Sequence, residues 1–154
     1  MQETYIGITS LVERLHRQFL ELLKLELDHQ GVYDINNVQA LMLFNIGDAE
    51  MTIGELTSRG CYLGSNVSYN VKKMVENGYL SQQRSVDDRR SIRVRLTKKG
   101  AKLCDRVQTM QQRHIEMLNQ TAITDKDLQS AAATLGRLDR FLDLVPDEAA
   151  RSAA

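Results

Sequence analysis

The chain has little proline and little cysteine. Its 154 residues include a single proline, Pro146, and two cysteines, Cys61 and Cys104. Proline breaks helices because it lacks a backbone N–H and its ring clashes with the preceding turn, so long helices are permitted almost everywhere. Two cysteines do not make a disulfide framework, and we expect two reduced thiols. By its length the chain is expected to fold as one domain with a substantial core.

Long apolar runs are also missing. No stretch approaches the roughly 18 apolar residues that a membrane span needs. The N-terminal segment lacks the basic start and apolar stretch of a signal peptide. We therefore expect a cytoplasmic protein without a membrane partner.

The motifs of common enzyme classes are absent. The sequence has no Gly-rich phosphate loop, no nucleophile elbow and no Cys-x-x-Cys pair. His16, His29 and His114 lack the spacing of metal ligands. We predict that the protein is not an enzyme and uses neither a cofactor nor a metal.

The net charge is zero, but the charges are unevenly distributed. Between Met51 and Arg106 twelve Lys or Arg residues stand against five Asp or Glu, a net charge of +7, so the rest of the chain carries −7. A basic centre with acidic flanks favours a polyanionic partner for the centre alone.

Apolar residues at helical spacing predict long helices at both ends of the chain. The first runs from Thr4 to about Gln30, and the last two from Thr97 to about Gln120 and from Asp125 to about Leu144. Capping signals predict three shorter helices between them. These signals are Asn36 with Gln39, Thr52 with Glu55, Ser65, and Gly78 after the last of the three.

Residues 79–96 have the pattern of a β-hairpin. In the return strand Ile92, Val94 and Leu96 alternate with Arg93 and Arg95, which predicts a buried apolar face and an outward basic face. The fold class is therefore mainly α with a small β-hairpin wing, a winged helix–turn–helix lobe between N- and C-terminal helices.

Three short motifs, at fixed spacing from one another, resemble those of one protein family. They are Asn77-Gly78-Tyr79-Leu80, Asp88-Arg89-Arg90 and Leu96-Thr97-Lys98-Lys99-Gly100. The stretch 51–100 looks like the DNA-binding lobe of the MarR-type transcriptional regulators. The resemblance implies a homodimeric repressor that binds a palindromic operator in double-stranded DNA. It divides the chain into dimerisation regions at 1–34 and 98–154 around a DNA-binding lobe at 35–97.

The residues expected to touch DNA lie on the predicted recognition helix, 65–77, and on the wing, 84–95. An α-helix fits the major groove, and arginine suits a narrow minor groove, where the resemblance places Arg90. Asp88 is expected either to orient Arg90 or to pair with the partner arginine. The full set is Ser65, Asn66, Ser68, Tyr69, Asn70, Lys72, Lys73, Arg84, Asp88, Arg89, Arg90, Arg93 and Arg95.

The resemblance also implies a small aromatic or anionic effector that releases the DNA. His16, Arg17, Tyr33 and Phe44 are the candidate ligand-binding residues. Two alternatives stay open. One is a redox-sensing regulator that uses Cys61, since a helix N-terminus lowers a thiol pKa. The other is a non-specific architectural winged-helix protein.

Overall fold

The computed structural model describes residues 1–60, 64–84 and 92–152, and the side chains of 1–58, 66–84 and 92–145. The chain divides into two compact units, Met1–Met110 and Gln111–Ala154. Within the described ranges no helix is both long and apolar enough to cross a membrane.

Helices α1 (Gln2–His29) and α2 (Asn37–Ile46) end close to where the sequence predicts, and α2 also begins there, but α1 begins two residues before the predicted start at Thr4. Gly31 follows α1 with φ +65°, and the N–H of Val32 bonds back to the carbonyl of Leu27 at 3.0 Å, which satisfies a carbonyl at the helix end. At the start of α2, Asn36 and Gln39 form the predicted reciprocal cap, at 2.8 and 3.1 Å. These local bonds confirm both boundaries.

Helices α3 (Ile53–Gly60) and α4 (Gly64–Glu76) form the helix–turn–helix. Thr52 caps α3 as predicted, because its hydroxyl accepts from the N–H of Glu55 at 3.1 Å and the Glu55 carboxylate accepts from the N–H of Thr52. The α4 helix already begins at Gly64, two residues before the start that a cap at Ser65 predicts, so that prediction is wrong. Gly78 ends α4 with φ +77°, as predicted.

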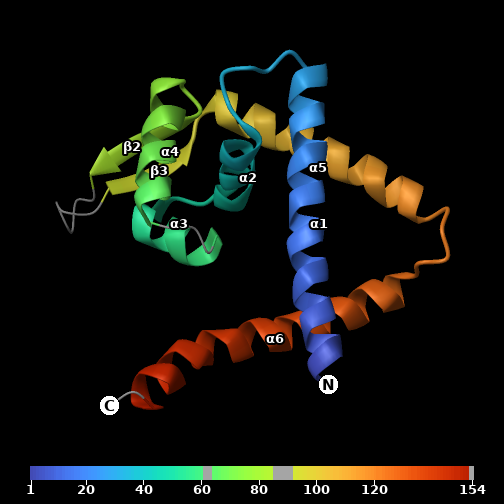
Figure 1. Cartoon of the computed structure of the whole chain (residues 1–154). Helices are drawn as coiled ribbons and strands as arrows, with labels where there is room; N and C mark the ends of the chain where they lie inside the picture. The colour runs from blue at the N-terminus through green and yellow to red at the C-terminus, as the bar shows by residue number, and fades with distance from the viewer. Residues whose placement is uncertain (61–63, 85–91, 153–154) are drawn as a thin grey trace. The chain divides into compact units, whose positions relative to one another are not determined.

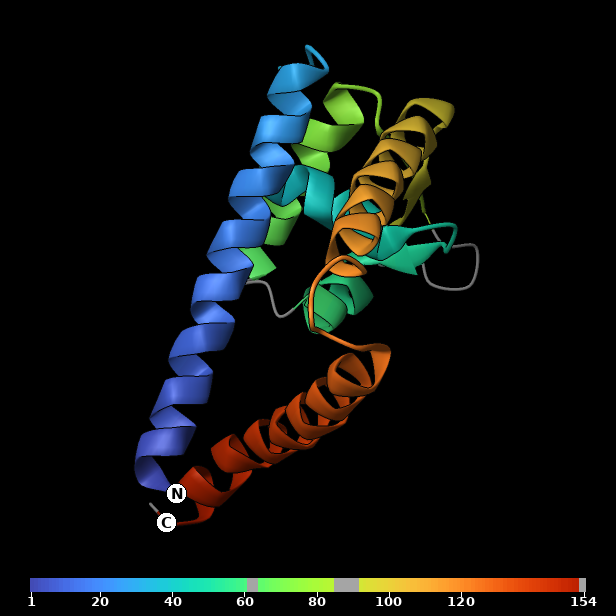
Figure 2. The same cartoon turned by 90° about the vertical axis from the view of Figure 1, so that its right-hand side faces the viewer.

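The sheet contains the predicted hairpin and one strand that the sequence reading missed. Strand β2 (Leu80–Arg84) pairs antiparallel with β3 (Ile92–Leu96), and β3 also pairs with β1 (Met51–Thr52), giving the order β1-β3-β2. Figures 1 and 2 both place the hairpin on the side of the unit Met1–Met110 that is remote from α1.

The predicted burial of β3 is correct only in part. Val94 is fully buried and Leu96 packs against the core, but Ile92 is 36% exposed. Ile92 pairs with Arg84 at the outer end of the hairpin, beyond the reach of the helices that cover Val94. Alternation fixes the face on which a residue lies, but not how far the core extends along it.

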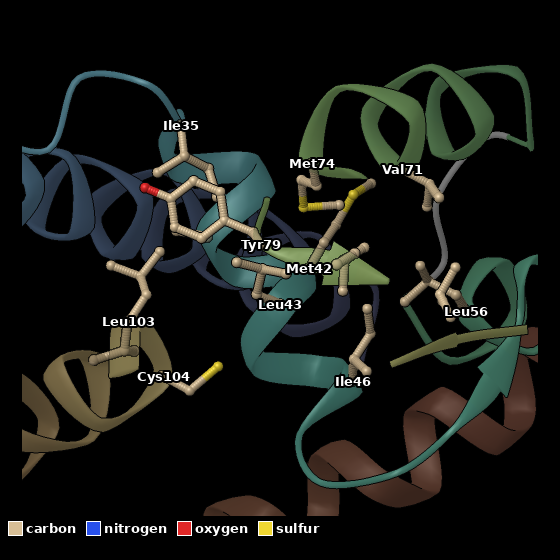
Figure 3. Packing of buried hydrophobic residues seen from close by; sticks show 14 of the residues in the cluster. Ile35, Met42, Leu43, Ile46, Leu56, Val71, Met74, Tyr79, Leu103 and Cys104 are labelled. Atoms are coloured by element: carbon tan, nitrogen blue, oxygen red, sulfur yellow. The ribbon is translucent and has the colours of Figure 1, made fainter. Parts of the chain in front are cut away.

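The core gathers around α2. Figure 3 shows Met42, Leu43 and Ile46 of α2 between side chains of α4 and of α5 (Lys98–Leu118). Each of the three is at most 2% exposed. The α4 and α5 side chains on either side of them include Val71, Met74, Leu103 and Cys104.

The two C-terminal helices differ from expectation at their ends. The α5 helix stops at Leu118, two residues before the predicted end at Gln120. The α6 helix (Asp125–Ser152) continues through Pro146, where the prediction stops at Leu144. Its first residue follows a cap that the sequence reading did not identify, in which the Thr124 hydroxyl accepts from the N–H of Asp127 and the Asp127 carboxylate from the N–H of Thr124.

Candidate nucleic-acid interface

Helix α4 has one buried face and one polar face. Val67, Val71 and Met74 are each at most 2% exposed, and they turn the remaining positions outward at helical spacing. Four of the predicted DNA-contacting residues are exposed, and Tyr69 is 62% exposed. They are Asn66, Ser68, Tyr69 and Lys72. The side chain of Ser65 lies outside the described residues.

Asn70 is only partly exposed and differs from its neighbours. Its side-chain Nδ2 donates to the carbonyl of Asn66 at 2.8 Å, and its Oδ1 accepts from Nε2 of Gln39 at 3.0 Å. Gln39 is 7% exposed. The expectation that the Asn70 amide simply faces outward is therefore wrong, because the amide is bonded to α2 over a separation of 31 residues. Sequence reasoning identified Gln39 as a cap but missed this bond.

Lys73, on the same helix, is paired within the chain. Its Nζ lies 2.9 Å from Oε2 of Glu76. The hydrogen bond raises the pKa of Lys73 above its usual value and lowers the pKa of Glu76. Both side chains are more than 40% exposed, so the pair contributes little to stability and a phosphate can compete for the ammonium group.

The arginines of the hairpin lie on two faces. In the register Ser81 pairs with Arg95 and Gln83 with Arg93, while Arg84 pairs with Ile92. Paired residues share a face, so Arg93 and Arg95 lie on one face and Arg84 on the other. Arg95 is exposed and donates from Nε to Ser81 Oγ at 3.3 Å. The predicted contacts Asp88, Arg89 and Arg90 lie outside the described residues.

A polar cluster joins the loop after α1 to the end of α4 and the start of α5. Asp34 accepts from the hydroxyl of Tyr79 at 2.5 Å and from Nζ of Lys99. Lys99 also donates to the carbonyl of Asn77 at 2.9 Å and lies 4.1 Å from the centre of the Tyr79 ring. Asn77 donates in turn to the carbonyl of Asp34 at 2.6 Å.

This cluster perturbs two acids. The hydrogen bond from Lys99, followed by that from Tyr79, holds the pKa of Asp34 below its usual value. Burial, and then the bond to Asp34, raises the pKa of Tyr79. The partners are separated by 43 to 65 residues along the chain, and no local pattern in the sequence marks them.

The structure does not bring the four candidate ligand-binding residues together. His16 and Arg17 are exposed on α1, where Arg17 pairs with Glu13. Tyr33 is 79% exposed and lines a surface hollow that Tyr69 of α4 also lines. Phe44 packs against the core.

Of the two cysteines, the structure describes only Cys104. Cys61 lies outside the described residues. Cys104 is buried, and burial, followed by the charges of Asp105 and Asp48, raises the pKa of its thiol to about 11. Within the part of the chain that the structure describes, no group of His, Cys, Asp or Glu is arranged to hold a metal ion.

Comparisons with known proteins agree with this geometry. A family model described as a winged helix DNA-binding domain matches residues 35–100. The chain is 38% identical over 136 residues to the exopolysaccharide II synthesis transcriptional activator ExpG of Rhizobium meliloti (strain 1021), covering 88% of this chain and 70% of that protein.

The chain also has the same fold as solved structures, among them the following two. One is Streptococcus pneumoniae FabT in complex with DNA, with a TM-score of 0.72 at 20% identity over 92% of this chain and 99% of that chain. The other is a MarR transcriptional regulator from Methanosarcina mazei Go1, with a TM-score of 0.72 at 20% identity over 90% of this chain and 98% of that chain.

Proposed function

Because the chain belongs to the MarR-type family of winged helix transcriptional regulators, we propose that it acts as a homodimer on a palindromic operator. Helix α4 enters the major groove, and the wing at 84–95 reaches the minor groove. The observation that carries this proposal is the exposed polar face of α4, with Asn66, Ser68, Tyr69 and Lys72 turned away from its buried face. An α-helix with such a face fits the major groove.

The charge distribution supports a large electrostatic contribution to binding. The net charge of +7 between Met51 and Arg106 lies in the winged lobe and the start of α5. If about six phosphates are neutralised per dimer, the logarithm of the affinity falls with the logarithm of salt at a slope of about −5. A gel-shift titration over a salt series measures that slope, and a flat series would contradict the proposal.

Sequence specificity separates a regulator from an architectural protein. The duplex that the protein selects from a randomised pool should bind at least about a thousandfold more tightly than random duplex. Equal affinity for both would favour the non-specific architectural alternative. Footprinting on genomic fragments, starting with the region upstream of the protein's own gene, then locates the operator.

The wing residues Arg90 and Asp88 are assigned from the family resemblance. Arg90→Ala is expected to abolish specific binding and to leave the dimer intact. Asp88→Ala is expected to weaken binding although it removes a negative charge, because Asp88 holds an arginine in one direction. A model based on charge alone predicts the opposite result, and gel-shift titration of both variants distinguishes the two.

Dimerisation is supported by the apolar side chains that the terminal regions leave exposed. Only Leu23 and Leu27 are buried in α1, and α6 exposes large apolar side chains along its length. A stripe of this kind needs a partner surface. The exposed residues are Ile6, Leu11, Val12, Leu15, Leu22 and Leu25 on α1, and Leu128, Leu135, Phe141, Leu142, Leu144 and Val145 on α6.

Light scattering tests the dimer directly. The wild type should have twice the mass of one chain at micromolar concentration, and Leu15→Asp should shift it toward the monomer. Ser10→Asp is the matched control for the added charge, because Ser10 is an exposed polar residue that lies about 140° around the same helix from Leu15. A monomeric wild type would refute the proposal.

The direction of regulation has two candidates. A repressor follows from an operator that overlaps a promoter. Activation is the second candidate, because the relative with 38% identity is named a transcriptional activator. Transcription in vitro from a template that carries the footprinted operator decides between them, since added protein lowers the transcript in one case and raises it in the other.

An effector is expected to release the DNA, although the four candidate residues do not share one site. A hollow of about 310 Å³ at the end of α1 suits a small aromatic anion better. Its lining includes apolar Val32 and Leu103, and its charged side chains are three cations and one carboxylate, namely Lys99, Lys102, Arg106 and Asp34. Benzoate serves as the probe. It should raise the melting temperature of the wild type, and Lys102→Ala should remove that effect.

The redox alternative rests on Cys61. Peroxide treatment followed by a gel shift tests it, with Cys61→Ser as the control. Loss of binding in the wild type and not in Cys61→Ser would favour redox sensing, whereas unchanged binding in both would exclude it.

A further inference from the structure

Gln39 carries a buried polar side chain in the described part of the lobe, and every polar atom of its amide has a partner. Its Oε1 accepts from the N–H of Asn36 at 3.1 Å, and its Nε2 donates to Oδ1 of Asn70 at 3.0 Å. The side chain therefore performs two tasks. It caps α2, and it binds the recognition helix.

The two amides form one directed chain of hydrogen bonds. At one end is the backbone N–H of Asn36, which requires an oxygen, so Gln39 must turn its NH₂ group toward α4. Asn70 must then present Oδ1 to Gln39, and its NH₂ group turns to the carbonyl of Asn66, 2.8 Å away. With a backbone donor at one end and a backbone acceptor at the other, each amide has one orientation that satisfies all its neighbours.

This chain fixes the part of α4 that faces DNA. Asn66 and Asn70 are one helical turn apart and flank Ser68 and Tyr69, which are exposed. Packing of Val67 and Val71 alone lets a helix slide or rotate slightly, whereas a buried hydrogen bond to α2 has a narrow range of geometry. The bond therefore sets the rotation at which the exposed side chains meet the base edges.

We propose that Gln39 is a positioning residue for sequence recognition. Asn70 belongs to the same chain of hydrogen bonds and does not contact a base. The inference rests on the proposed DNA binding and adds the residue pair that orients the recognition helix. It replaces the expectation that Asn70 touches DNA, because a bidentate contact with adenine needs the donor and the acceptor of the amide to be turned toward the groove together.

Three variants separate positioning from reading. Gln39→Leu introduces an apolar side chain of similar size and removes both hydrogen bonds. Gln39→Glu keeps the acceptor for the N–H of Asn36 and removes the donor to Asn70, so it separates the recognition helix from the cap of α2. Asn70→Ala removes the other partner. Gln108→Leu, at an exposed position of α5, is the matched control for the change from glutamine to leucine.

The experiment is selection from a randomised duplex pool by full-length wild type and each variant, followed by gel-shift titration on the wild-type duplex and on random duplex. We expect Gln39→Glu, Gln39→Leu and Asn70→Ala to lose preference over the same group of adjacent base pairs. Each should bind the wild-type duplex about tenfold more weakly and random duplex as before. The double variant Gln39→Leu/Asn70→Ala should be no weaker than either single variant, because both break one chain of bonds.

Other outcomes overturn the inference. If Asn70→Ala loses preference at one base pair while both Gln39 variants retain the wild-type preference, Asn70 reads a base. If the Gln39 variants weaken binding to both duplexes by the same factor, the role of Gln39 is structural only. If the wild type enriches no sequence, the proposed function fails, and this inference fails with it.

Discussion

Replacing Gly100 by alanine should be the most damaging small substitution at the junction between the wing and α5. Gly100 is buried in the first turn of α5, and a Cβ built there would lie 2.3 Å from the carbonyl oxygen of Tyr79 and 3.3 Å from Cδ2 of Leu96. Approaches below 3.0 Å essentially do not occur. The clash is with backbone, so no rotamer change relieves it.

The loss of stability in Gly100→Ala depends on which atoms must move to make room for the methyl group. The carbonyl of Tyr79 also accepts the N–H of Thr97 at 3.0 Å, so a shift that makes room for the methyl group weakens the junction between β2 and α5. Overpacking costs about 1–3 kcal/mol, and we expect Gly100→Ala to lie near the upper end, at about 3 kcal/mol. For a chain of this size that is a loss of about 6–12 °C in melting temperature.

Urea unfolding followed by circular dichroism measures this loss. All variants are compared at one protein concentration, because the stability of the proposed dimer would depend on that concentration. Gly54→Ala is the control, since the nearest atom to its new Cβ is the hydroxyl of Thr52 at 3.8 Å, and it should stay within about 1 kcal/mol of the wild type. A Gly100→Ala protein as stable as Gly54→Ala would refute the reasoning.

Three other variants or reagents test separate contacts. Gly78→Ala should cost about 1 kcal/mol in the same assay, because φ at that position is +77°. Asp34→Ala should be less stable than the wild type at neutral pH. Because its partners lower the pKa of Asp34 below 3.8, its contribution is complete above pH 3.8 and is lost as the pH falls below it, so the two proteins should converge in acid. Cys104, with a thiol pKa of about 11, should escape iodoacetamide at pH 8 until the protein is unfolded, as measured by mass spectrometry.

The features that sequence predicted correctly depend on residues close together in the chain. The caps at Asn36 and Thr52 and the stop at Gly78 each involve residues within about four positions, so their chemistry can be read directly from the sequence. The hairpin was also accessible from the sequence, because apolar and basic residues alternate along its return strand.

The features that sequence missed depend on distant partners. Strand β1 has two residues and exists only through its pairing with β3, some 40 residues later. The bonds from Gln39 to Asn70 and from Asp34 to Lys99 likewise join elements that only the tertiary fold brings together. Ile92 was expected to be buried because its spacing is correct, but the core ends before the strand does.

The shortest strand, β1, has a consequence for the DNA binding that we propose. Thr52 pairs with Arg93 of the wing and also caps α3, so one residue fastens the wing strand to the helix–turn–helix. The position of β3 relative to α3 is thereby fixed within one chain. In the homodimer that we propose, the spacing between the two subunits is then the distance that can change, and we expect the proposed effector to act on affinity through that spacing.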